Sequence, residues 1–266
     1  MISVDAHHHL WDTAVRDYSW MDGPWADPIR GRFDLARYAE PVPARESVVV
    51  QAVTDESETR ELLTAPVGGV VGWTDLTAPD VAERLAELKG AGPLVGIRHL
   101  AQDEPDPGWL TRPPVMRGIA AVGAAGLVYD LLVRPPQAAA ALDVARRLPE
   151  VSFVLDHAGK PDIAHGVWEP WAGWITELAA LPNVTVKLSG LVTEAGPDWR
   201  PADIVPYARH VLAAFGPSRT MYGSDWPVCT LAATPAQVTA LAEEVIPADA
   251  AAEVMGGTAR RVYRLG

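Results

Sequence analysis

Short apolar runs recur eight times along this chain, and stretches with helical periodicity separate many of them. Most runs are near-continuous in apolar residues, which is typical of strands that are buried on both faces. The alternation of strand and helix favours parallel βαβ units. The predicted strands are Ile2–Ala6, Ser47–Val53, Gly69–Trp73, Leu94–His99, Gly126–Val133, Val151–His157, Asn183–Ser189 and Thr220–Asp225. The predicted helices are Pro79–Lys89, Pro136–Leu148, Trp168–Leu181, Ala202–Phe215, Pro235–Val245 and Pro247–Tyr263.

Two architectures are built from such units, a doubly wound open sheet and a closed (β/α)8 barrel. Eight repeats favour the barrel, which typically takes about 250 residues. No shift in composition divides the chain, so we expect residues 1–266 to form a single α/β domain with a (β/α)8 barrel fold. Two long, loop-like segments, 10–44 and 102–114, follow predicted strands. We therefore expect both on the catalytic face of the barrel.

The charge balance excludes several classes of partner. The chain has 22 basic and 34 acidic residues, a net charge of −12. This argues against nucleic acid and against an anionic membrane surface, because both need positive faces. No apolar stretch reaches the ~20 residues of a membrane span, and no targeting segment is visible, so we expect a cytoplasmic protein. The single cysteine, Cys229, excludes an intramolecular disulfide and any multi-cysteine metal site, and a small buried apolar role is expected for it. Assembly into a homo-oligomer stays open.

Polar residues gather where the predicted strands end, and in a barrel these ends carry the chemistry. Side chains alternate along a strand, so His7 and His9 point to one side and His8 to the other. Two imidazoles in this spacing can converge on a metal ion or on one substrate group. The alternative for this pair is two polar residues in a solvated loop. For His157 alone it is a hydrogen-bonded core histidine, and for Asp225 alone a turn or cap residue. The other candidates at strand ends are Arg98, Tyr129, Asp130, Asp156, His157, Lys160, Lys187 and Asp225.

Several ordered stretches carry a resemblance to a known family. They are Val4–Asp12, Gly96–His99, Gln102–Pro105, Leu155–Pro161, Lys187–Leu191 and Met221–Pro227. With these motifs the chain resembles the amidohydrolase superfamily, and within it the group that contains sugar lactonases such as L-fuconolactonases, and 2-pyrone-4,6-dicarboxylate lactonases. The resemblance implies a distorted (β/α)8 barrel. It also implies that His7 and His9 form the metal-ligand motif of the first strand, that His157 is the downstream histidine, and that Asp225 is the general base.

The chain departs from the pattern of the binuclear members of this superfamily. The fourth predicted strand offers Arg98, the fifth Tyr129 and Asp130, and only the sixth supplies a histidine, so a binuclear centre is not expected. We expect either no metal or one divalent ion, with zinc as the first candidate. Its ligands would be His7, His9, His157 and Asp225.

Opening a lactone requires a base, charge stabilisation at the carbonyl oxygen, and positioning. Asp225 is the candidate base, and burial would have to raise its pKa. His7, His9 and His157 can hydrogen-bond the carbonyl oxygen or hold one ion. The candidate substrate contacts are Arg98, Trp11, Tyr129, Lys160 and Lys187, each with a structural ion pair or core packing as its alternative. Specificity is expected to depend on the segments 10–44, 102–114 and 192–200.

The leading hypothesis is a metal-independent or mononuclear-zinc hydrolase that opens an aldono-1,4- or 1,5-lactone to its acid. The second is a mononuclear zinc-dependent hydrolase or decarboxylase of the same fold that acts on a small carboxylate substrate. The third is a ligand-binding barrel without catalysis, for which loss of the base or of the histidines would be the signature. The sequence retains all of these residues.

Overall fold

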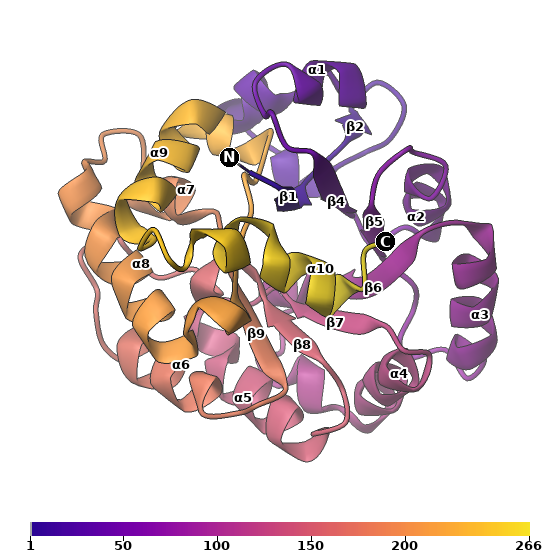
Figure 1. The fold of residues 1–266 in the computed structure, drawn as a ribbon. Helices are drawn as coiled ribbons and strands as arrows, with labels where there is room; N and C mark the ends of the chain where they lie inside the picture. The colour runs from indigo at the N-terminus through magenta and orange to yellow at the C-terminus, as the bar shows by residue number, and fades with distance from the viewer. Residues whose placement is uncertain (1) are drawn as a thin grey trace.

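The computed structural model describes residues 2–266, and its parallel strands form one curved sheet surrounded by helices (Figure 1). The sheet has eight strands in the order β1-β4-β5-β6-β7-β8-β9-β10. All neighbouring pairs in this order are parallel. The strand bounds are β1 Val4–His8, β4 Glu46–Val50, β5 Gly69–Gly72, β6 Leu94–His99, β7 Val128–Leu131, β8 Phe153–Leu155, β9 Val184–Leu188 and β10 Thr220–Tyr222.

Backbone hydrogen bonds beyond β10 join the two edge strands. The amide of Asp225 donates to the carbonyl of His7 at 2.8 Å, and the amide of His9 donates to Trp226 at 2.7 Å. His8 and Trp226 form a parallel bridge between them. The sheet is therefore a nearly closed (β/α)8 barrel, which confirms the predicted fold and excludes the doubly wound alternative.

Helices pack around the barrel, and their positions correct several sequence predictions. The predicted loop 102–114 contains the short helices η3 (Ala101–Asp103) and η4 (Trp109–Thr111), and α4 already begins at Pro113. The helix α3 runs from Val81 to Ala91, so it begins two residues after the start of the predicted helix Pro79–Lys89 and ends two residues beyond it. The helix bounds are α1 Leu35–Ala39, α2 Glu56–Leu62, α3 Val81–Ala91, α4 Pro113–Ala124, α5 Ala138–Arg147, α6 Trp171–Ala179, α7 Leu191–Ala195, α8 Pro201–Phe215, α9 Pro235–Val245 and α10 Thr258–Tyr263.

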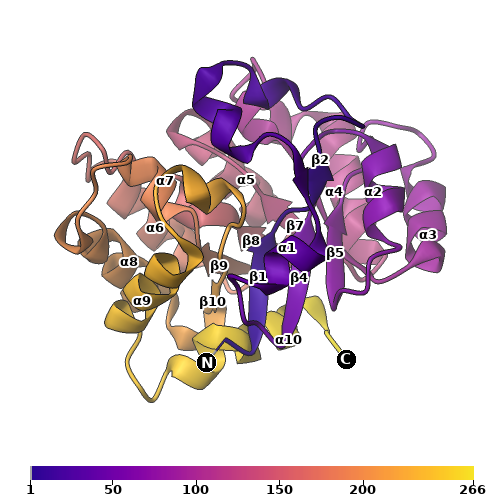
Figure 2. The same cartoon turned by 90° about the horizontal axis from the view of Figure 1, so that it is seen from above.

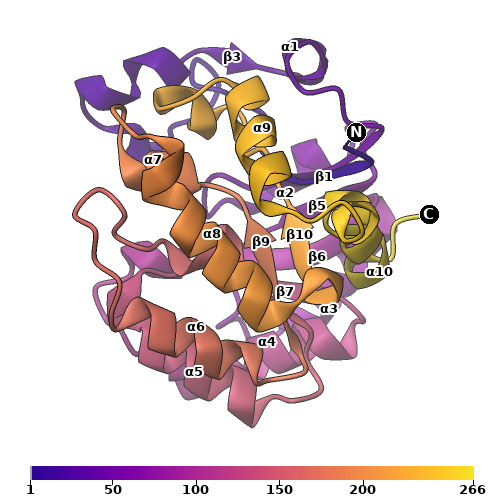
Figure 3. The same ribbon diagram turned by 60° about the vertical axis from the view of Figure 1, so that its left-hand side comes forward.

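The long segment after β1 has structure of its own. It contains an antiparallel pair, β2 (Trp11–Asp12) with β3 (Arg32–Phe33), and the short helices η1 (Ser19–Met21) and η2 (Pro24–Ile29). In Figure 2 this segment lies at one end of the barrel and α10 at the other. Figure 3 shows α7, α8 and α9 along the outside of β9 and β10. The barrel thus has one end covered by insertions and one end crossed by the C-terminal helix.

The helices of residues 2–266 include none that combines enough length with enough apolar character to cross a membrane.

Candidate active site

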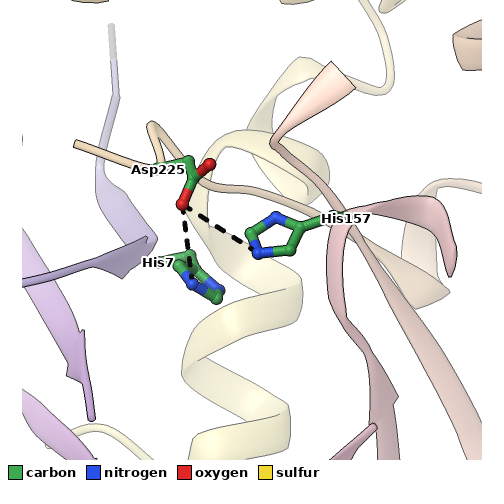
Figure 4. A group of neighbouring side chains, drawn as sticks. All are labelled: His7, His157 and Asp225. Atoms are coloured by element: carbon green, nitrogen blue, oxygen red, sulfur yellow. Dashed lines mark ion pairs between the residues drawn. The ribbon is translucent and has the colours of Figure 1, made fainter. Parts of the chain in front are cut away.

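Three histidines and one aspartate meet at the carboxyl ends of β1, β8 and β10. His7 and His9 come from the end of β1, His157 follows β8, and Asp225 follows β10. Asp225 Oδ1 lies 3.8 Å from His7 Nε2, 3.6 Å from His9 Nε2 and 3.9 Å from His157 Nε2. Figure 4 shows the carboxylate facing the rings of His7 and His157. Asp225 Oδ1 is buried and has no hydrogen-bond partner among residues 2–266, so it can take a proton or bind a ligand.

A left-handed backbone turn aims Asp225 at the histidines. Its φ is 57°, a conformation that costs free energy in any residue other than glycine. Asp5 on β1 holds the turn, because its carboxylate accepts the backbone amide of Ser224 at 2.8 Å and the Ser224 hydroxyl at 2.6 Å. The Tyr38 hydroxyl donates to the same carboxylate at 3.0 Å. The contacts that close the barrel therefore also position the candidate base.

His157 is positioned by a second left-handed segment. Residues 157–160 all have positive φ, from 51° to 69°. The ring Nδ1 of His157 is 2.9 Å from the Ser189 hydroxyl, just beyond β9. Gly190 leaves room for the ring, because a Cβ there would lie 2.5 Å from His157 Nδ1. The Lys187–Gly190 stretch of the sequence thus supports the imidazole through one hydrogen bond and one missing side chain.

Burial keeps the imidazoles neutral and raises the pKa of the carboxyl group. Desolvation lowers the pKa of His9 to about 3 and that of His157 to about 4, and holds the pKa of His7 well below its usual range. Desolvation raises the pKa of Asp225, although the positive charges of Lys160 and Arg98 oppose this. Neutral imidazoles keep nitrogen lone pairs available, and a carboxylate with a raised pKa is a better base.

The hydrogen bonds of His7 allow two arrangements of its ring protons. In one, Nδ1 accepts from Lys187 Nζ at 3.1 Å and Nε2 donates to His9 Nε2 at 3.2 Å. His9 can accept this bond because its Nδ1 donates to the carbonyl of Val50 at 2.7 Å. In the other, Nδ1 of His7 carries the proton and faces Asp156 Oδ1 as an ion-pair contact at 3.4 Å, and the Nε2 lone pair faces Asp225. Only the second arrangement leaves His7 free to bind a cation.

The donor set fits one divalent ion. One ligand atom each from His7, His157 and Asp225 lies within 4.8 Å of the others, and all three residues are buried. Imidazole nitrogen and carboxylate oxygen are ligands that zinc accepts. The orphaned Oδ1 of Asp225 is consistent with such a ligand role.

Buried charges lie behind the histidines. Arg98 Nη1 pairs with Asp156 Oδ2 at 2.9 Å and approaches His7 Nε2 at 3.4 Å. Lys187 Nζ pairs with Asp156 Oδ1 at 3.0 Å and with Asp130 Oδ2 at 2.6 Å. Burial alone would raise the pKa of Asp156, but Lys187, His7 and Arg98 hold it well below its usual range. These pairs fix the position of Arg98 and Lys187 before any substrate binds.

A cavity opens in front of this cluster. Five of the predicted site residues line it: His9, Arg98, His157, Lys160 and Asp225. Two residues that sequence reasoning did not single out, Trp20 on η1 and Glu194 on α7, also line it, and so does Gln102 on η3, from the motif Gln102–Pro105. They come from the three segments in which specificity was expected. No residue-level signal identified Trp20 or Glu194 as a cavity residue, because each is one aromatic or acidic residue within a long connection.

Three predicted substrate contacts lie away from the cavity lining. Trp11 lines a separate surface groove, and its indole donates to the carbonyl of Ile29 at 3.0 Å. Tyr129 is fully buried among apolar residues of the barrel. Lys187 is fully buried in its ion pairs. Trp11, Tyr129 and Lys187 are therefore not among the residues that line the cavity in this structure.

Two further residues also face away from the cavity. His8 is fully buried and stacks on Tyr38, with ring centroids 4.0 Å apart. Cys229 is fully buried, and burial raises the pKa of its thiol. Neither group touches the histidine cluster as a ligand or a nucleophile would.

The comparisons with known proteins agree with this geometry. The sequence model of the Amidohydrolase family matches residues 4–265. The chain belongs to the amidohydrolase family. The resemblance seen in the sequence motifs is thereby confirmed.

Three relatives are similar over nearly their full length. An L-fucono-1,5-lactonase of Burkholderia ambifaria is 40% identical to this amidohydrolase and covers 98% of this chain and 95% of its own. A crystal structure of a Burkholderia multivorans amidohydrolase with bound HEPES has a TM-score of 0.91 at 38% identity, and covers 100% of both chains. A second crystal form of an amidohydrolase from that organism, with bound zinc, has a TM-score of 0.89 at 38% identity and the same coverage.

Proposed function

We propose that this amidohydrolase opens a sugar-derived lactone to its hydroxy acid, with Asp225 as the general base. The observation that carries the proposal is the buried, unpartnered Oδ1 of Asp225, which lies within 4 Å of His7, His9 and His157 beside the cavity. The similarity to an L-fucono-1,5-lactonase supports an aldonolactone as the substrate.

The proton transfers follow from the positions of these groups. Asp225 takes a proton from a water molecule, whose oxygen bonds to the lactone carbonyl carbon. The carbonyl oxygen becomes an oxyanion, which the N–H donors of His157 and Arg98 on the cavity wall can stabilise. The bond between the carbonyl carbon and the ring oxygen then breaks. The ring oxygen receives the proton held by Asp225, and the product is a hydroxy acid.

The same cluster is proposed to bind one divalent ion, with zinc as the first candidate. His7, His157 and Asp225 would hold it, and His9 lies beside them. A bound ion would polarise the carbonyl oxygen and lower the pKa of water. The zinc-bound relative supports this part of the proposal.

A panel of aldono-1,4- and 1,5-lactones, assayed with a pH indicator, tests the reaction. We expect hydrolysis above the uncatalysed rate, and a loss of roughly 10²- to 10⁴-fold in kcat for Asp225→Asn. Asp143→Asn, an exposed residue on α5, is the matched control. Hydrolysis of none of the lactones, or full activity in Asp225→Asn, would contradict the proposal.

Metal analysis after purification without chelators tests the second part. Stoichiometric zinc, and activity that chelation removes and zinc restores, would support the ion. Full activity in a metal-free preparation would show that the histidines and Asp225 suffice.

A further inference from the structure

A largely buried ion pair lines the wall of the active-site cavity. Lys160 follows His157 in the left-handed segment after β8, and Glu194 lies on α7 after β9. Their side chains are only 15% and 17% exposed, and Lys160 Nζ lies 3.5 Å from Glu194 Oε1. Both residues line the cavity. Neither side chain makes a hydrogen bond to another side chain or to the backbone within residues 2–266, so both can still bond a group in the cavity.

Burial of these two charged groups costs free energy unless a ligand supplies the hydrogen bonds that they lack. Largely desolvated charged groups lose free energy when their hydrogen bonds are not made. Desolvation lowers the pKa of Lys160, while the charge of Glu194 opposes that shift. Gln102 adds a third incomplete group, because its Oε1 is buried without a partner. Lys160, Glu194 and Gln102 thus form a polar wall of the cavity whose hydrogen bonds are not all made.

A hydroxyl group matches this wall better than a carboxylate does. A hydroxyl can donate to the Glu194 carboxylate and accept from the Lys160 ammonium at the same time. A substrate carboxylate has no proton to donate, and Glu194 would repel it. The opposite charges of the pair therefore select a group that both donates and accepts.

The other charges on the lining lead to the same conclusion. Its cations are Arg98 and Lys160, and its acidic residues are Asp103, Glu194 and Asp225. Arg98 is already committed to Asp156 at 2.9 Å, and Lys160 faces Glu194. Each cation on the described lining thus already faces a carboxylate, which leaves no excess positive charge to neutralise an anionic substrate.

We propose that Glu194 and Lys160 form a hydroxyl-binding subsite that makes this enzyme select neutral, polyhydroxylated lactones over lactones that carry carboxylates. The inference rests on the proposed lactonase function and specifies its substrate class. Glu194 is the specificity-determining residue, because its charge provides both the hydroxyl acceptor and the repulsion of anions.

A comparison of substrates with and without ring hydroxyls tests the subsite. The probes are L-fucono-1,5-lactone, the unsubstituted δ-valerolactone, and 2-pyrone-4,6-dicarboxylate. For Glu194→Gln we expect kcat/KM on the hydroxylated lactone to fall roughly 10- to 100-fold, since the hydroxyl loses its charged acceptor and Lys160 loses its partner. On δ-valerolactone we expect a change of less than about twofold, because that ring makes no such bond. Glu177→Gln, an exposed residue on α6, is the matched control.

The outcomes separate the subsite from the reaction. Equal losses on the two neutral lactones, or no loss on either, would overturn the subsite while lactone hydrolysis stands. A wild-type preference for the dicarboxylate would also overturn the subsite and leave lactone hydrolysis in place. Hydrolysis of none of the probes and of none of the aldonolactone panel would overturn the proposed function and the subsite with it. Because Gln keeps the shape of Glu, a thermal melt that matches wild type shows that altered folding does not cause the effect.

Discussion

Backbone strain concentrates at the residues that face the cavity. The non-glycine residues with positive φ are His157, Ala158, Lys160, Asp225 and Arg264, and three of them line the cavity. Each such residue costs on the order of 1 kcal/mol or more, so the surrounding contacts must hold it in place. Asp5 supplies these contacts for the Asp225 turn, and Gly190 leaves the space for His157.

Replacing Gly190 with alanine should displace His157. The new Cβ would lie 2.5 Å from His157 Nδ1, and the φ of 67° already disfavours alanine. We expect kcat/KM to fall by at least about tenfold, because misplacement of a reacting group by about 1 Å costs that much or more. Gly196→Ala is the control, since its φ is 81° but a Cβ there would meet no atom within 4 Å. Equal losses in the two variants would show that backbone conformation alone is responsible.

The pH dependence of the reaction should follow Asp225. A base acts when deprotonated, so kcat/KM should rise with pH through the pKa of Asp225, which burial places above its ordinary value of 3.8. His157 and His9 have pKa values of about 4 and about 3, so they stay neutral over most of this range. A pH–rate profile between pH 4 and 9 measures this limb, and Asp225→Asn should abolish it. A limb that persists in that variant would assign it to another group.

At the scale of elements, patterns in the sequence locate the strands better than the turns that follow them. The predicted strand Leu94–His99 coincides with β6, whereas the run Val151–His157 yields a strand that ends at Leu155. His157 turns left-handed there, and an apolar run does not encode that change. The helix α4 was not predicted from the sequence, because the prolines in its first turn are also typical of loops.

The site residues also divide into those that the strand pattern predicts and those that it does not. The histidines and Asp225 follow buried strands, so their shared place at one end of the barrel could be predicted from sequence. Trp20 and Glu194 reach the cavity from η1 and α7, within long connections. Which side chain of such a connection faces inward depends on its packing over the barrel, and no periodicity specifies that packing.

A buried glutamate links α2 to the end of β4 and should make stability depend on pH. Glu58 Oε2 accepts the amides of Ala52 at 2.9 Å and Val53 at 3.1 Å, while its Oε1 is buried without a partner. Burial raises its pKa from 4.5 to about 7. The folded state thus binds this proton more tightly than the unfolded state does. Stability from this group is therefore present below pH 4.5 and is lost as pH rises towards 7.

For Glu58→Gln we expect the free energy of unfolding to depend less on pH. The difference between wild type and variant should change by ~3 kcal/mol between pH 4.5 and 8, measured by urea unfolding. Glu61→Gln on the same helix, with a side chain that is 64% exposed, is the control. Parallel pH dependences for wild type and Glu58→Gln would contradict a raised pKa at this site.

At the scale of the whole molecule, a chain of buried polar contacts crosses the barrel from α10 to the histidines. The Tyr263 hydroxyl donates to Asp130 Oδ2 at 2.8 Å, and Asp130 pairs with Lys187 at 2.6 Å. Lys187 in turn contacts His7 Nδ1 at 3.1 Å. Figures 1 and 2 show α10 across the end of the barrel that is opposite the insertions. The C-terminal helix thus supports the site from behind.

Removing the hydroxyl of Tyr263 tests this long-range support. Tyr263→Phe leaves the buried carboxylate of Asp130 without one donor, which should cost about 1–3 kcal/mol of stability. Because Asp130 and Asp156 share Lys187, we also expect kcat to fall several-fold with little change in KM, since no cavity contact is altered.

Tyr222→Phe is the matched control. That tyrosine is equally buried on β10 but bonds the neutral hydroxyl of Thr239 at 3.0 Å, so its loss should stay near 1 kcal/mol and leave kcat unchanged. Urea unfolding measures the free energy of unfolding of both variants, and steady-state kinetics measures their kcat and KM. Equal effects would show that α10 contributes packing alone, whereas a selective loss of kcat in Tyr263→Phe would connect the closed end of the barrel to the orientation of His7.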